Sequence, residues 1–406
     1  MDSLVTAAAR ALAAGDPLGA LNLVALRTDA PALALRGIAM AQLGDFPKAR
    51  ALIKSAARAF GPKEGRARAR CVVAEAEIAL ASRDLGWPAK SLEAARRTLE
   101  EHGDAINAAH ARYLEIRRDV LIGRLEIARR SLAAVDAARL PAALRTVHEL
   151  LVAAIAIRHL HTADAKAALE RASQAAHAAR IPALLAEVRA AAQSLDAPAA
   201  RVARRGVDEP LRLADVETLL ASRALVIDAC RNAVRGGGTV VSLVSRPVLF
   251  TLLRALGEAW PNDVPRGELV RRAFRAREAD ESYRARLRVE MGRLRRAVAK
   301  LATIEATPDG FALRPRRARE VVVLKPAVDG DHGDVLAFLA DGESWSSSAL
   351  ALALGASQRT VQRALDELSA ARKVQSYGRG RARRWMTPPL PGIATSLLLP
   401  APPTGG

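Results

Sequence analysis

Cysteine and aromatic residues are scarce in this sequence of 406 residues, which has two cysteines and only 3% phenylalanine, tryptophan and tyrosine. Cys71 and Cys230 lie in different regions, so neither a disulfide framework nor a cysteine metal site is expected. Long apolar runs are also missing, since none approaches the roughly 18 residues that a membrane-spanning helix needs. The start of the chain contains an acid, Asp2, and lacks the basic segment of a secretory signal peptide. These absences predict a cytoplasmic protein without a membrane segment.

Side chains that carry chemistry are equally sparse. The sequence has seven histidines, and no Ser-His-Asp or Cys-His arrangement has a supporting context. The Gly236–Gly238 run lacks the lysine and the following helix of a phosphate-binding loop. His159 and His161 are two residues apart, so on one helix they would not share a face and would not bind a metal together. We therefore expect no enzyme activity, no cofactor and no metal site.

Acidic residues are outnumbered, with 43 Asp and Glu against 62 Lys and Arg, which gives a formal net charge of +19. Only eight of the 62 basic residues are lysine, and arginine is the better residue for contacting bases and clamping phosphates. Polyanions are the expected partners. Half of the residues are apolar, mostly alanine and leucine, which favours close-packed helices over a β-sandwich or barrel. The length allows roughly two to four domains.

The first 200 residues are predicted to be helical almost throughout, from Ser3 to about Leu195, with Ala and Leu at three- and four-residue steps. LGDFPKARALIKSA at 43–56 is echoed from residues 85, 122 and 161, which places the small residues Ala49, Ala89, Ala128 and Ala167 about 40 residues apart. A small residue at fixed phase lets two antiparallel helices pack tightly, so each repeat is interpreted as one helical hairpin. The pattern resembles tetratricopeptide-like repeats, which implies a concave surface for a protein or peptide partner. A non-repetitive helical bundle is the alternative.

Residues 196–210, with Pro198, Gly206 and Pro210, are interpreted as a linker with a basic middle. Strands are expected at 225–229 and 239–243, joined through the Gly236–Gly238 turn. A helix with apolar residues from Val248 to Leu256 follows, then a short helix from about residue 264, a long helix from about Ser282 to Leu301, and a hairpin closing near Leu313.

Residues 207–326 resemble the OmpR/PhoB-type winged helix in the order and lengths of these elements. The matching residues include Arg246-Pro247, Leu269, the Arg293-Leu294-Arg295 run and Gly310-Phe311. The resemblance implies that the long helix enters the major groove of DNA, with Arg288, Val289 and Arg293 toward bases and Arg284, Arg286 and Arg296 toward phosphates. The hairpin tip carries Asp309 where the family often has a basic residue, so this wing is expected to add little affinity. A solvated basic surface helix is the alternative.

Residues 347–366, SSALALALGASQRTVQRALD, are typical of a DNA-binding helix-turn-helix. Ala351 is small where the helices cross, Gly355 suits the turn, and Val361 anchors the second helix. A basic hairpin follows, so residues 327–388 resemble the small winged domains of the MarR, IclR and DeoR type; an amphipathic helical hairpin is the alternative. The candidate DNA-binding residues are Ser357, Gln358, Arg359, Gln362 and Arg363 on the second helix, with Arg379, Arg381 and Arg383 in the wing. Residues 389–406 form a proline-rich tail.

The expected fold class is mainly α, with a helical repeat region followed by two winged helix-turn-helix (α+β) domains. The expected function is that of a sequence-specific transcriptional regulator that binds double-stranded DNA through both winged domains. Two alternatives remain: a helical scaffold whose winged domains bind proteins, and a non-specific DNA-packaging protein. The expected partners are double-stranded DNA, a protein or peptide on the helical region, and a second copy of the chain.

Overall fold

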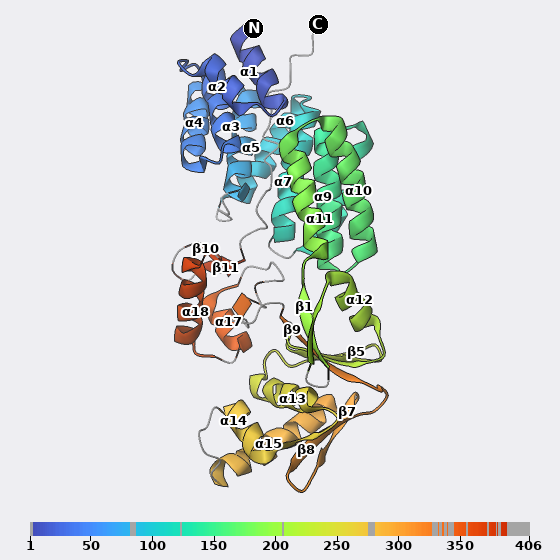
Figure 1. Ribbon diagram of the computed structural model, residues 1–406. Helices are drawn as coiled ribbons and strands as arrows, with labels where there is room; N and C mark the ends of the chain where they lie inside the picture. Colours follow the sequence, from blue (N-terminus) through green and yellow to red (C-terminus); the bar gives the residue numbers. More distant parts are fainter. Residues whose placement is uncertain are drawn as a thin grey trace. The chain divides into compact units, whose positions relative to one another are not determined.

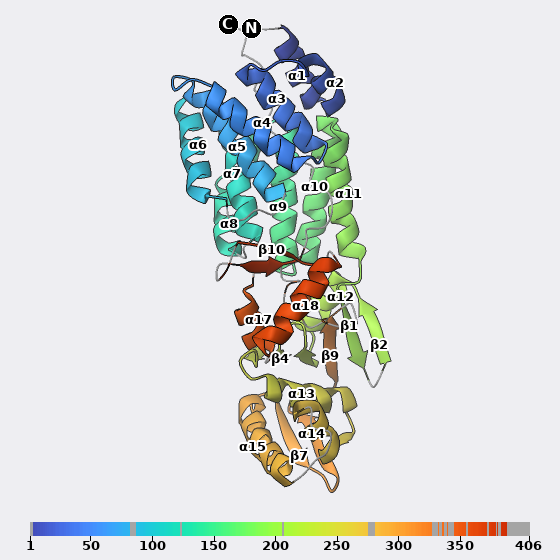
Figure 2. The ribbon, with the colours of Figure 1, turned by 90° about the vertical axis from the view of Figure 1, so that its left-hand side faces the viewer.

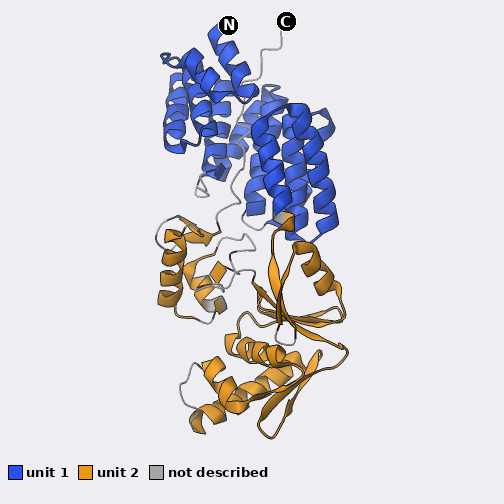
Figure 3. Cartoon of the chain, viewed as in Figure 1, with its two compact units in different colours: residues 1–194, 377–380, 388–406 blue, residues 195–376, 381–387 orange. Residues whose placement is uncertain are grey.

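The computed structural model describes residues 3–81, 87–121, 124–204, 207–274, 281–326, 332, 335–336, 339, 345–354, 356–371, 373–378, 380 and 383–387. The chain divides into two compact units, residues 1–194, 377–380 and 388–406 in one and residues 195–376 and 381–387 in the other (Figure 3). Helices predominate and strands form a smaller part, as the composition predicted. Gly355, Arg379, Arg381 and the tail lie outside the described residues.

The first unit is helical, which confirms the prediction for residues 3–195 (Figure 1). Aspartates begin three of the early helices, because the side chains of Asp16, Asp29 and Asp45 each accept a hydrogen bond from a backbone amide of the first turn. The α-helices are α1 Ser3–Ala13, α2 Pro17–Val24, α3 Ala30–Gln42, α4 Phe46–Ala59, α5 Gly65–Ala81, α6 Ala89–Glu101, α7 Ala105–Leu121, α8 Leu125–Ala133, α9 Ala142–Arg158, α10 Thr162–Ala179 and α11 Pro182–Asp196, with a 3₁₀ turn η1 at Ala137–Arg139.

Consecutive helices pack as hairpins, but the predicted phase of the repeat holds only in part. α3 packs along α4, and α9 along α10, and the views of Figures 1 and 2 agree on the second pair. Ala49 and Ala128 are fully buried at such contacts. Ala167, by contrast, is exposed, and α10 packs instead through Ala165, Ala168 and Ala172. The alanine-rich sequence offers several small residues per turn, so the spacing of one of them does not identify the buried face.

The sequence argument placed His159 and His161 on different faces of one helix, and that placement is wrong. α9 ends at Arg158, Leu160 has a left-handed φ of 58°, and α10 begins at Thr162. This three-residue turn brings the two imidazole rings together, with centroids 6.0 Å apart and planes inclined by 28°.

The second unit contains a six-stranded sheet with the order β2-β1-β9-β3-β4-β5. The strands are β1 Ala200–Arg204, β2 Val207–Leu211, β3 Leu225–Asp228, β4 Ala233–Gly236, β5 Thr239–Ser242 and β9 Val321–Pro326. The strands expected at 225–229 and 239–243 are confirmed, but they do not form a direct pair, because β4 lies between them and pairs with both. The linker interpretation of 196–210 is wrong, because β1 and β2 form an antiparallel hairpin there and Val202 is fully buried. β9 pairs antiparallel with β1 and parallel with β3.

Four helices and a second, three-stranded sheet of order β6-β8-β7 complete this part of the unit. The helices are α12 Leu213–Ala221, α13 Pro247–Ala259, α14 Arg266–Phe274 and α15 Glu281–Val298, and the strands are β6 Asp263–Pro265, β7 Ala302–Ala306 and β8 Gly310–Pro315. The helices predicted from Val248, from 264 and from 282, and the closing hairpin, are therefore confirmed within a few residues. One core joins both sheets. Ile227 and Val323 of the large sheet share a cluster with Leu313 of β8 in the three-stranded sheet, together with Leu253 of α13 and Leu294 of α15.

The described residues between 345 and 387 contribute to a second small core. It is built by α17 Ser347–Leu354, α18 Gln358–Ala370 and the two-stranded sheet of β10 Gln375–Tyr377 and β11 Arg384–Met386. Leu350, Val361 and Leu365 pack there around Trp385, which is fully buried. The predicted helix pair and the hairpin after it are confirmed.

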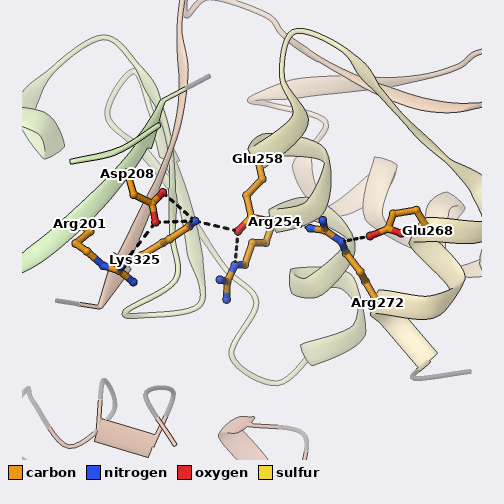
Figure 4. A network of polar contacts seen from close by, with 7 residues as sticks. All are labelled: Arg201, Asp208, Arg254, Glu258, Glu268, Arg272 and Lys325. Carbon is orange, nitrogen blue, oxygen red and sulfur yellow. Dashed lines mark hydrogen bonds and ion pairs between the residues drawn. The ribbon is translucent and has the colours of Figure 1, made fainter. Parts of the chain in front are cut away.

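An ionic network connects the large sheet to α13 and α14 (Figure 4). Glu258 is its centre: its carboxylate accepts hydrogen bonds from Arg254 Nε and Arg272 Nη1, both at 2.8 Å, and lies 3.7 Å from Lys325 Nζ. Lys325 in turn reaches Asp208 at 3.1 Å. Burial alone would raise the pKa of Glu258, but the hydrogen bonds and charges of Arg254, Lys325 and Arg272 outweigh it and hold that pKa below its usual value.

We expect Glu258→Gln to lower the free energy of unfolding at pH 7 by about 1–3 kcal/mol, because three cations lose their shared carboxylate. A depressed carboxyl pKa stabilises the fold above the unfolded-state value near 4.3 and ceases to do so as pH falls through the folded-state value. Denaturant unfolding between pH 7 and pH 3 should therefore show a steeper loss in the wild type than in the variant. The exposed Glu209 of β2 supplies the control, Glu209→Gln. Parallel pH curves for wild type and Glu258→Gln would contradict this role.

Candidate nucleic-acid interface

The helix α15 has one apolar side and a broad polar side. Leu287, Met291, Leu294 and Val298 are all buried, at the i, i+4, i+7 and i+11 spacing of one helix face. They pack α15 against α13, α14 and β7. The rest of the helix surface is directed away from the core.

Arginines occupy that surface and remain exposed although most have partners. Arg288 and Arg284 both approach Glu281, at 2.8 and 3.8 Å, and keep 68% and 60% of their side chains exposed. Arg293 is 57% exposed and pairs at 2.8 Å with Glu290. Arg286 stacks over the ring of Phe274, 4.5 Å from its centroid. Exposed ion pairs contribute only about 0–1 kcal/mol, so a polyanion can replace these carboxylates at little cost.

Three of the four residues along the middle of the exposed surface have small side chains, and the fourth is an arginine. At 100° per residue, Ala285, Val289, Gly292 and Arg296 lie opposite the buried stripe. Val289 is 55% exposed, and a Cβ built on Gly292 would have no atom within 4 Å. The arginines at 284, 286 and 288 therefore lie on the flanks of a low ridge. The sequence prediction included Val289 and Arg296 but missed Gly292, whose signal is a glycine within a long helix, where it is unfavourable.

The hairpin of β7 and β8 is fastened to the body of the unit near its tip. Arg266 of α14 donates to the carbonyl oxygens of Pro308 and Thr307, at 2.7 and 2.9 Å. Arg295 donates to the carbonyl of Ile304 at 2.8 Å. Both guanidinium groups lie over the ring of Phe311, at 5.5 and 5.6 Å from its centroid. This hairpin is thus held in place by arginines that are engaged with the protein itself.

The second candidate surface belongs to α18, in which Arg359 and Arg363 are matched in number by Asp366 and Glu367. Ser357 is its N-cap, and its Oγ accepts a hydrogen bond from the Thr360 amide at 3.1 Å. Val361, Ala364, Leu365 and Leu368 are buried, which leaves Gln358, Arg359 and Arg363 exposed. Gln362 is partly exposed and donates to Asp366 at 2.9 Å. Each candidate side chain on α18 other than the cap is therefore at least partly accessible.

In the hairpin that follows, the guanidinium of Arg383 stacks over the ring of Trp385 at 4.2 Å. Its two predicted companions, Arg379 and Arg381, lie outside the described residues.

No family model matches the chain, and neither the curated proteins nor the solved structures yield a match. Among the described residues, no three histidine, cysteine, aspartate or glutamate side chains are grouped so that they could hold a metal ion. Nor does that part of the chain contain a helix of the length and apolarity needed to cross a membrane.

Two helical glycines of this unit, Gly257 and Gly292, should respond oppositely to alanine. A Cβ on Gly257 of α13 would overlap Ile227 Cδ1 and lie 3.2 Å from Val323 Cγ2. We expect Gly257→Ala to destabilise the protein by about 1–3 kcal/mol through overpacking. Gly292→Ala meets open space and should stabilise it by about 0.5–1 kcal/mol through helix propensity. Denaturant midpoints of the two variants check this. A loss of stability in Gly292→Ala would show that Gly292 serves the packing of the free protein.

Proposed function

We propose that the chain is a sequence-specific DNA-binding transcriptional regulator that uses two winged helix-turn-helix modules, residues 207–326 and 327–388. In the first, α14 and α15 act as the helix pair and β7-β8 as the wing. In the second, α17 and α18 form the pair and β10-β11 the wing. The helical region would bind an effector or partner.

The observation that carries the proposal is the exposed surface of α15. A major groove is about 12 Å wide and accepts an α-helix, and its walls are phosphates. The middle of this helix is low from Ala285 to Gly292, Arg296 continues the same line, and further arginines lie on both flanks, which matches that shape and charge. The alternative of a protein-binding scaffold predicts a mixed or apolar surface, whereas Val289 is the one large apolar side chain of α15 that is exposed.

The positions on α15 suggest the roles of individual residues. Val289, Arg293 and Arg296 are nearest the middle of the exposed surface and would approach base edges, where arginine can donate to guanine and valine can contact a thymine methyl group. Arg284, Arg286 and Arg288 on the flanks would contact phosphates. This moves Arg296 toward the bases and Arg288 toward the backbone compared with the roles that the resemblance implied.

On α18, Gln358, Arg359, Gln362 and Arg363 would read bases, since glutamine suits adenine and arginine suits guanine. Ser357 would support the start of that helix and donate to a phosphate. Arg383, held by Trp385, would lie along the backbone of the duplex. Arg379 and Arg381 are proposed for the same backbone contact.

The test is the salt dependence of binding to DNA selected from a random pool. With about six to ten phosphates contacted, the affinity should fall about a thousandfold or more between 50 and 200 mM salt, and the selected pool should share a motif. Arg139→Ala, which removes a charge from the helical unit at a side chain that is 89% exposed, is the control for net charge. An affinity independent of salt would refute the proposal in favour of the scaffold, and a pool without a motif would favour DNA packaging.

A second prediction separates folding from binding. A Cβ at residue 292 meets no atom within 4 Å in the free protein, and leucine favours the helix more than glycine does. We therefore expect Gly292→Leu to fold with at least wild-type stability. In the complex its side chain would occupy the close approach between helix and groove, and DNA affinity should fall about tenfold or more. Gly292→Ala adds a smaller side chain and should lower DNA affinity less, so the loss of affinity should increase with the size of the side chain at residue 292. Equal DNA affinity for Gly292→Leu and wild type would exclude this helix face from the interface.

A further inference from the structure

The helical unit contains a cavity of about 780 Å³ bounded by α8, α9 and α10. Sites for small ligands commonly measure about 300–1,000 Å³, with an apolar lining and few polar groups at defined places. Residues of one compact unit line the cavity, and none of them is among the proposed DNA-binding residues. Nothing in the proposed DNA contacts makes use of it.

One face of α9 forms the floor. His148, Val152, Ile155, Ala156 and His159 are at positions i, i+4, i+7, i+8 and i+11 of one helix face, so they line a single strip about 16 Å long at 1.5 Å per residue. Leu132 and Ala133 of α8 form one wall, and Ala167 of α10 contributes to the other. The middle of the cavity is therefore apolar, and Ala167, which the repeat pattern placed at a helix contact, faces an open space instead.

One end of the cavity carries donors for an anion. Arg171 of α10 binds Glu149 Oε2 through Nε and Nη2, at 3.0 and 2.9 Å, and 51% of its side chain remains exposed. This arrangement fixes the guanidinium plane, and Glu149 itself does not line the cavity. Arg171 thus presents a positive charge that is oriented in advance.

His148 lies at the same end and is held from behind by the hydroxyl of Tyr113, 3.2 Å from Nδ1. Burial lowers the pKa of His148. The charge of Glu149 raises that pKa and the charge of Arg171 lowers it, and the net shift is downward, so the ring is neutral near pH 7. When the Tyr113 hydroxyl donates to Nδ1, the ring proton is on Nε2 and His148 is a hydrogen-bond donor. A neutral donor beside a guanidinium suits a carboxylate.

The opposite end has mixed charges. Glu126 accepts hydrogen bonds from Arg129, and Asp164 lies 3.9 Å from His161. The two acids would repel an anion there, whereas the end formed by Arg171 and His148 contributes no acid to the lining. The polarity of the cavity therefore orients a ligand with a single anionic group.

We propose that this cavity binds an organic acid with an apolar body, the carboxylate contacting Arg171 and His148 and the body lying along Val152 and Ile155. It would be the effector site of the helical unit. The inference does not rest on DNA binding, and its test contains no DNA, so either proposal can fail without the other.

Titration calorimetry on the full chain tests it with three ten-carbon probes that share one apolar body: decanoate, decanol and decylammonium. Decanoate should bind one to one with a dissociation constant below about 1 mM. The neutral alcohol should bind about tenfold or more weakly, and the cation should bind more weakly still, because both lack the charged hydrogen bonds. No binding of decanoate up to that concentration, or equal binding of all three probes, would overturn the proposal.

Variants locate the site. Arg171→Gln should weaken decanoate binding about tenfold or more. Arg129→Gln, which alters the other end of the same cavity, should stay within about twofold, as should Arg130→Gln on the neighbouring surface of α8. Ala167→Trp should block the cavity from an exposed position without displacing buried atoms. Circular dichroism would verify that each variant keeps its helix content. Wild-type binding in Arg171→Gln or Ala167→Trp, or an equal loss in Arg129→Gln, would refute this assignment.

Discussion

The packing of α13 is the constraint on which the proposed DNA-binding surface depends. Leu252, Leu253 and Leu256 of this helix are fully buried, and α13 contacts both sheets as well as α14 and α15. Gly257 permits the close approach to Ile227 and Val323 of the large sheet. Because the apolar stripe of α15 packs on α13, that packing determines which side of α15 carries its arginines, and their ion pairs only adjust the individual side chains.

The sequence predicted the elements well wherever their signal was local. Hydrophobic periodicity indicated α13, α15 and α18, and a run of turn residues indicated the hairpin of β7 and β8. The strand β9 escaped because its partners β1 and β3 precede it by roughly a hundred residues, and the β1–β2 hairpin escaped because half of the pairing of β1 is with that distant strand. A short basic segment with a proline looks like a linker until Val202 is seen beside Leu324.

The same difference between local and long-range signals applies to the prediction of the candidate sites. The arginines of α15 were found because charge at helical spacing is visible in the sequence, but the importance of Gly292 was not. The role of a glycine depends on which atoms surround it, and those atoms are known only from the three-dimensional structure. His148 and Arg171 were missed for a related reason: one belongs to α9 and the other to α10, and only the antiparallel packing of those helices brings them to one end of a cavity.

The central place of β9 in the large sheet has a consequence for synthesis on the ribosome. β1 cannot complete its pairing until Val323 and Leu324 have left the exit tunnel, some 120 residues later. At about 5–20 residues per second, this delay is on the order of 6–24 s. During that interval the hairpin of β1 and β2 has an unpaired edge, and the nascent chain already carries the arginines of α15. The first, helical unit has mostly local contacts and can fold first and separately. Folding therefore proceeds from the amino terminus, and the second unit is completed last.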